Sequence, residues 1–178
     1  PFATLASGNI RAASLAVGAR CLRLARPVEA LPKGVVSVAS IACAARFLSE
    51  NPGRALLTTG SKELAPYTSV ADFAERFFVR VLPLPGAITK CIDAGFSPSH
   101  VIGMQGPFTR ELNEAMLRQV GAQWLVTKDS GTVGGTAEKL ASARGAGARC
   151  IVVARPAEGG GALSLREVED ALLREFAR

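Results

Sequence analysis

The sequence has 178 residues, of which 48% are hydrophobic, enough for one good core and at most one domain plus a fragment. With 21 Lys and Arg against 15 Asp and Glu, its net charge of +6 favours an anionic partner. The basic residues form no run and aromatic residues make up only 6%, so we expect no nucleic-acid partner. No apolar run approaches the roughly 20 residues of a membrane span, so we expect no membrane partner.

The N-terminal stretch predicts a helix over 4–17 and a short strand over 21–25, followed by a linker that contains Pro27, Pro32 and Gly34. One helix and one strand cannot form a core. Residues 1–32 are therefore predicted to be the C-terminal remnant of a preceding α/β domain plus a linker. The alternative, that this helix and strand pack onto the main domain, stays open.

From residue 33 onward, strand and helix signals alternate. Five strands are predicted, over 54–58, 77–82, 100–103, 124–127 and 149–154. Helices are predicted over 40–49, 86–94, 109–120, 136–144 and 164–177, the last opened by a capping box at Ser164, with at most one helical turn over 62–65. Residues 33–178 are therefore predicted to form an α/β domain, a Rossmann-like open parallel sheet with helices on both faces.

The helix predicted over 109–120 shows an apolar pattern that sets its expected orientation. Leu112, Ala115, Met116 and Val120 recur at helical spacing and are predicted to face the core. Gly121 is predicted to end this helix.

The four cysteines, Cys21, Cys43, Cys91 and Cys150, are far apart and form no Cys-x-x-Cys pair. Because the chain has a single histidine, no metal site is predicted. Three of the cysteines lie in apolar surroundings and are predicted to be small core residues. We expect free thiols and a cytoplasmic location, because no signal peptide is recognisable.

Four loops follow predicted strand ends, over 59–61, 104–107, 128–131 and 155–156. The carboxyl ends of parallel strands meet at one edge, where glycine-rich turns and backbone N–H groups can hold an anion. Lys62, Lys128 and Arg155 would add positive charge there, which predicts a phosphate site. Neither Gly-x-Gly-x-x-Gly nor a Walker A sequence is present, so the pattern alone does not identify the ligand.

Other conspicuous residues are predicted to be structural. His100 begins a predicted strand and would lie at the edge opposite the loops. Trp124 is predicted to be core, and Tyr67 to pack in a turn after residues 59–61. Asp129 is predicted either to cap the next turn or to touch substrate.

Several blocks of the sequence together resemble the precorrin-6A reductase family of cobalamin biosynthesis. The similarity runs from residue 1 to about 156. It rests on Met104–Asn113, on Val126–Gly131 with Gly134-Gly135 and Glu138-Lys139, and on residues 22–27, 57–61 and 80–83. In this family a full-length chain begins with an α/β domain that has a glycine-rich first turn, which this sequence lacks.

The resemblance implies an NADPH-dependent enzyme that reduces the precorrin-6A macrocycle to precorrin-6B, with a hydride from nicotinamide and a separate proton. Its partner would be a tetrapyrrole with several carboxylates, with or without cobalt, and the chain is expected to be monomeric. The alternatives are a non-catalytic nucleotide- or phosphate-binding α/β domain and, on charge alone, a nucleic-acid binder.

The family blocks also imply site residues. Those assigned to the cofactor are Thr58, Thr59, Gly60, Ser61, Gln105, Gly106, Pro107, Phe108, Ser130 and Gly131. Lys128 and Asp129 are the candidate catalytic residues, with solvent as a further possible proton source. Lys128, Lys139 and Arg155 are expected to bind substrate carboxylates, and Gly135, Glu138 and Lys139 to frame the start of the next helix.

Overall fold

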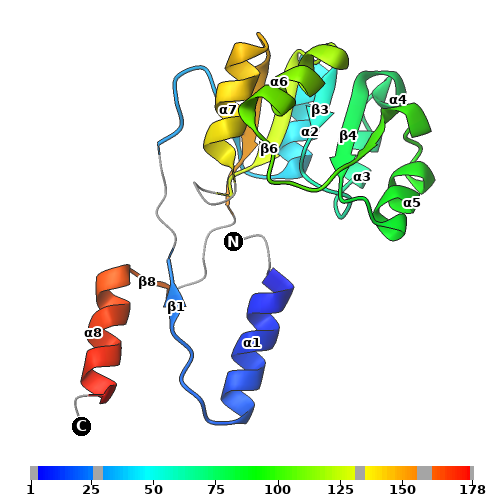
Figure 1. The fold of residues 1–178 in the computed structure, drawn as a ribbon. Helices are drawn as coiled ribbons and strands as arrows, with labels where there is room; N and C mark the ends of the chain where they lie inside the picture. The colour runs from blue at the N-terminus through cyan, green and yellow to red at the C-terminus, as the bar shows by residue number, and fades with distance from the viewer. Residues whose placement is uncertain (1–3, 26–29, 131–134, 156–161, 177–178) are drawn as a thin grey trace. The chain divides into compact units, whose positions relative to one another are not determined.

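The computed structural model describes residues 4–25, 30–130, 135–155 and 162–176 (Figure 1). Its contacts divide the chain into two compact units. One comprises Ala30–Ala154, and the other joins Pro1–Glu29 to Arg155–Arg178. In this grouping residues 155–178 fall with the N-terminal stretch, whereas the sequence places them with residues 33–154, and the predicted domain boundary stays a prediction.

The unit of residues 30–154 is built on a six-stranded sheet in which all neighbours are parallel. The order is β2-β7-β6-β3-β4-β5, with β2 Val36–Val38, β3 Ala55–Leu57, β4 Phe77–Val81, β5 Val101–Gly103, β6 Trp124–Lys128 and β7 Arg149–Val153. The predicted open parallel α/β sheet is thus confirmed. The sequence reading missed β2, because its three residues lie between linker signals and a helix cap.

Helices cover both faces of this sheet (Figure 1). They are α2 Ile41–Glu50, α3 Ala65–Thr68, α4 Phe73–Arg76, α5 Pro85–Asp93, the 3-10 turn η1 Pro98–His100, α6 Arg110–Gln119 and α7 Thr136–Gly145. Because side chains alternate along a strand, Leu125 and Trp124 in β6 point to opposite faces. Leu125 packs in the cluster with Leu117 of α6 and Ala143 of α7, whereas Trp124 meets Phe47 of α2 edge to face.

Helix α6 is rotated relative to the prediction. Asn113 and Leu117 are its buried side chains. Of the four residues predicted to face the core, the C-cap Val120 is buried and Met116 is half-buried, whereas Leu112 is 39% exposed and Ala115 is exposed. The apolar pattern excluded Asn113 from the core because it is polar. In the structure its amide oxygen accepts a hydrogen bond from a buried arginine, which makes its burial possible.

The structure records all four cysteines as free thiols, as predicted. Only Cys91 and Cys150 are buried, while Cys21 and Cys43 are exposed, so the expectation of three core cysteines was wrong by one. Among the described helices, none is both long enough and apolar enough to span a membrane.

The other unit contains α1 Thr4–Ala16, β1 Arg23–Leu24, β8 Ala162–Leu163 and α8 Leu165–Phe176 (Figure 1). β1 and β8 form a two-stranded parallel pair, and Arg20 forms an ion pair with Glu175 at 3.1 Å. The predicted capping box is present, since Glu167 accepts hydrogen bonds from both the backbone N–H and the hydroxyl of Ser164. None of the described side chains of this unit is buried.

Candidate functional site

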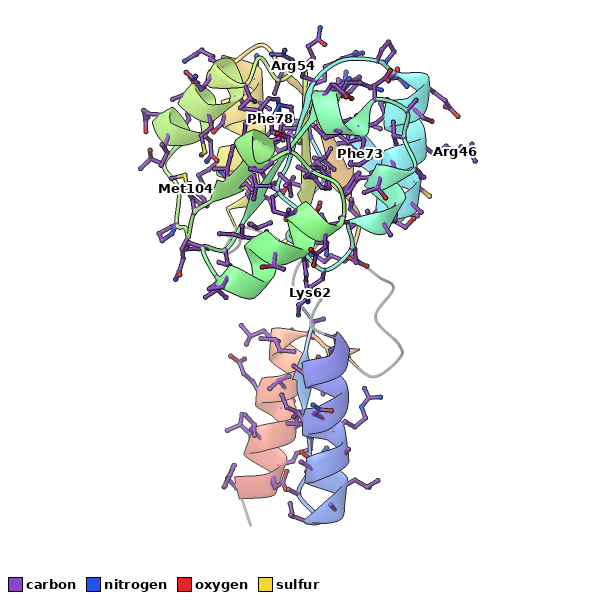
Figure 2. All side chains as sticks on the ribbon, turned by 90° about the vertical axis from the view of Figure 1, so that its right-hand side faces the viewer. Arg46, Arg54, Lys62, Phe73, Phe78 and Met104 are labelled. Atoms are coloured by element: carbon purple, nitrogen blue, oxygen red, sulfur yellow. The ribbon has the colours of Figure 1, made fainter. Side chains whose placement is uncertain are left out.

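A cavity of 630 Å³ lies at the carboxyl edge of the sheet, in the unit of residues 30–154. Its walls come from the ends of β3, β4 and β5, the loop before α6, and the first turn of α7. The described lining residues are Thr58, Gly60, Arg80, Val81, Leu82, Met104, Gly106, Pro107, Phe108, Asn113, Gly135, Glu138 and Lys139. Figure 2 shows Met104, at the end of β5, and Lys62, in the loop after β3, both at this edge.

Arg80 is the most deeply placed charge in this pocket. It is the fourth residue of β4 and is only 6% exposed. It lies on the same face of the strand as Phe78, which packs against the cluster that contains Leu117 of α6 and Ala143 of α7. Its Nη1 donates a hydrogen bond of 2.7 Å to Oδ1 of Asn113 and lies 3.8 Å from the sulfur of Met116. Burial lowers the pKa of Arg80 to about 10, so the side chain is cationic at neutral pH.

Phe108 covers the other side of that guanidinium. The Cζ of Arg80 lies 3.9 Å from the centroid of the Phe108 ring, a cation–π distance. Gly106 makes room for this ring, because a Cβ at residue 106 would come within 3.1 Å of two of its carbons. The loop before α6 is then closed by Thr109, whose hydroxyl caps the helix by accepting from the N–H of Leu112.

Lys139 supplies a second, half-buried cation from the first turn of α7. Burial is the main cause that lowers its pKa, and the charge of Arg80 lowers it further, whereas Glu138 acts in the opposite sense. Arg80 and Lys139 both line the cavity. Cys150 in β7 is buried, and burial raises the pKa of its thiol to about 12, whereas the charge of Lys139 acts in the opposite sense.

The loop after β3 contributes less than predicted to the cavity wall. Thr58 and Gly60 line it, although the Thr58 hydroxyl is already donated to the Val126 carbonyl at 2.8 Å. Thr59 is buried, with its hydroxyl 3.3 Å from that of Tyr67, and Ser61 is not among the lining residues. Tyr67 is fully buried and its phenol pKa is raised by that burial, which agrees with its predicted packing role.

Of the remaining residues predicted to bind the cofactor, some line the cavity and others lie outside its described lining. Gly106, Pro107 and Phe108 line the cavity, whereas Gln105 and Ser130 are not among its described lining residues. The Ser130 N–H donates to the Thr136 hydroxyl at 3.1 Å, which ties the loop to the start of α7. Gly131 lies outside the described residues.

The two candidate catalytic residues lie at the end of β6, outside the described lining. Lys128 is four-fifths buried and forms an ion pair with Glu63 at 2.7 Å. The backbone N–H of Asp129 donates to the Val153 carbonyl, which extends the β6–β7 pairing by one residue. Of the three predicted substrate-binding cations, Lys139 lines the pocket, Lys128 does not, and Arg155 belongs to the other unit.

Sequence reasoning assigned no role to Arg80 or Asn113. A signal was present, because an arginine within the apolar run of 77–82 is unusual in a strand that is covered on both faces. Asn113 gave no such signal, since a polar residue in an amphipathic helix is ordinarily exposed.

Comparison with known proteins gives concordant results. The family model described as "Precorrin-6x reductase CbiJ/CobK" matches residues 1–174. A cobalt-precorrin-6A reductase from Methanothermobacter thermautotrophicus is 38% identical over 161 residues, which cover 88% of this chain and 52% of that protein. One from Salmonella typhimurium is 37% identical over 160 residues, covering 88% of this chain and 60% of the relative.

Among solved structures, a CobK precorrin-6A reductase superposes with a TM-score of 0.73, covering 98% of this chain and 70% of that one. The sequence identity is 24%, so this likeness supports the fold. The chain spans only about half to three fifths of the length of the two curated relatives.

Proposed function

Because this chain belongs to the precorrin-6x reductase CbiJ/CobK family, we propose that the complete protein reduces precorrin-6A to precorrin-6B with NADPH during cobalamin biosynthesis. The observation that carries the proposal is the pocket itself. It lies within the segment that the family model matches, and its walls include residues of three sequence blocks that resemble the family. The proposal concerns the complete protein, since its relatives are substantially longer than this chain.

The residues of the pocket fit a nicotinamide nucleotide or a carboxylate-rich macrocycle. A volume of 630 Å³ lies within the range of about 300–1,000 Å³ that is usual for small-ligand sites. Two partly or fully buried cations, Arg80 and Lys139, face this space together with the ring of Phe108. When bound, NADPH would supply the hydride that the reduction needs.

The chain's own residues would then bind, orient and protect the reacting groups. We propose that Phe108, which lines the cavity, limits the access of water to the bound ligand. Lys128 and Asp129 remain the proposed sources of the proton, with solvent as the alternative. The ion pair with Glu63 would hold the Lys128 ammonium in place until substrate arrives.

The remaining sequence predictions are part of the same proposal. We propose roles in cofactor binding for Thr58, Gly60, Gly106, Pro107 and Phe108, which line the cavity. Arg155 is proposed to bind substrate carboxylates. A cytoplasmic, monomeric protein with a tetrapyrrole as its small-molecule partner would complete this assignment.

The test is a reductase assay with the complete protein, NADPH and either precorrin-6A or its cobalt complex. Oxidation of NADPH that depends on the macrocycle, monitored by loss of absorbance at the nicotinamide band, is the expected result. NADH in place of NADPH is the control for cofactor preference. If NADPH binds but no tetrapyrrole is reduced, the alternative of a non-catalytic nucleotide-binding α/β protein would be favoured.

A further inference from the structure

Arg80 carries a permanent charge deep in the protein without an acidic partner among the described residues. The residue is only 6% exposed. The carboxylates that form ion pairs within the described ranges contact Arg20, Arg46, Arg110, Arg118 and Lys128 instead. Buried charges are normally paired, because removal from water is costly unless an opposite charge compensates.

The surroundings of Arg80 hold the guanidinium in place but do not neutralise it. Asn113 accepts one hydrogen bond through a neutral amide, and Phe108 presents a ring face. The cavity is also lined by Lys139, which is positive as well, and by Glu138, which forms no ion pair with Arg80 within the described ranges. Asn113 and Phe108 restrict the planar donor group to one orientation, in which it borders the cavity. A guanidinium fixed in this way is suited to paired hydrogen bonds with a phosphate or carboxylate.

We propose that Arg80, positioned by Asn113 and Phe108, binds an oxyanion of the ligand in this pocket, and that Lys139 adds to the attraction. The oxyanion is a phosphate of the nucleotide or a carboxylate of the macrocycle. The inference does not depend on the reductase activity, because it would hold equally for a non-catalytic nucleotide-binding protein.

The first experiment measures binding of three anionic probes to the 178-residue chain by calorimetry: NADP⁺, NAD⁺ and the octacarboxylate porphyrin uroporphyrin. Arg80→Met removes the charge and keeps an unbranched side chain. We expect this substitution to weaken the affinity of the chain for the probe that Arg80 binds by about 10- to 100-fold, the usual effect of losing charge-assisted hydrogen bonds. Arg46→Met is the matched control, because the Arg46 side chain is 82% exposed on α2. We expect the affinity of this variant for each probe to stay within about twofold of the wild-type value.

The three probes distinguish the source of the anion. If Arg80→Met loses affinity for NADP⁺ but hardly for NAD⁺, Arg80 binds the 2′-phosphate. An equal loss for both nucleotides assigns it to the pyrophosphate, and a loss confined to uroporphyrin assigns it to a macrocycle carboxylate. Each of these results supports the proposal.

A second variant, Asn113→Asp, separates anion binding from folding. It is nearly isosteric and places a carboxylate against the guanidinium, where Nη1 and Oδ1 are 2.7 Å apart. We expect the Asn113→Asp variant to unfold at a temperature no lower than that of the wild-type chain, because the buried cation gains a counter-charge. Its affinity for the probe should fall by about as much as that of Arg80→Met. Wild-type affinity for all probes in both variants, or no binding of any probe by the wild-type chain, would overturn the proposal.

Discussion

Arg80 determines the electrostatics of the pocket because burial and immobilisation act on the same guanidinium. Phe108 and Asn113 fix the group from two sides, and Gly106 is needed so that the aromatic ring can reach it. The family blocks identified most of the loops that line the cavity. They did not identify this contact, because it joins β4 to α6 across 33 positions of sequence, a pairing that local patterns cannot reveal.

The cysteines allow a prediction about individual thiols. Cys21 and Cys43 are exposed, whereas Cys91 and Cys150 are buried and burial raises the pKa of both buried thiols, to about 12 for Cys150. Since the thiolate is the reactive form, the two buried thiols should be unreactive at pH 8. We expect an aromatic disulfide reagent to modify two thiols rapidly in the folded chain and all four in denaturant.

Two variants control for the assignment of these thiols. Cys43→Ser should lower the rapid stoichiometry from two to one, while Cys150→Ala should leave it unchanged and lower only the denatured total. Rapid modification of Cys150 in the folded chain would contradict the burial described for β7.

At the scale of elements, alternating strand and helix signals predicted the sheet well because each buried strand is a short apolar run between turns. Two deviations have physical causes. β2 lies directly between the linker signals at Pro32 and Gly34 and the helix cap Ser40, so no separate strand signal stands out, and it pairs with β7. Helix α6 buries the polar side chain of Asn113. The apolar pattern therefore predicted the adjacent helix face, with Leu112 and Met116, as the buried one.

The orientation of α6 predicts contrasting effects of two leucine substitutions. Leu117 is 1% exposed within the cluster between α6, α7 and the sheet, whereas Leu112 is 39% exposed. Leu117→Ala should therefore lower the free energy of unfolding by about 2–5 kcal/mol, the cost of a cavity in a core. Leu112→Ala should lower it by about 0.5 kcal/mol or less, as is usual at exposed positions.

Urea denaturation followed by circular dichroism measures both changes, and equal slopes of the transitions would show that the comparison is valid. A larger loss for Leu112→Ala than for Leu117→Ala would support the apolar stripe predicted from the sequence and contradict the orientation in the structure.

At the scale of the whole chain, the hydrophobic core is distributed unevenly between the two units. The buried apolar residues all lie between Ile41 and Val153 in the described part of the chain. In the other unit Leu15 and Phe176 are 82% and 83% exposed, although β1 and β8 pair in parallel as in an α/β sheet. The sequence predicted a second α/β domain for residues 1–32 only. We propose that β8 and α8 belong to it as well, because a two-stranded pair is marginal alone.

This distribution predicts that residues 30–154 fold without the rest of the chain. They contain the six-stranded sheet, the helices on both its faces and all residues that line the described pocket. Expressed alone, this segment should unfold cooperatively with a midpoint within about 5 °C of the complete chain, a difference worth roughly 1 kcal/mol. Leu117→Ala in the same segment should lower the midpoint clearly, which shows that the transition reports the core. A segment without cooperative unfolding would mean that side chains outside residues 30–154 complete the core.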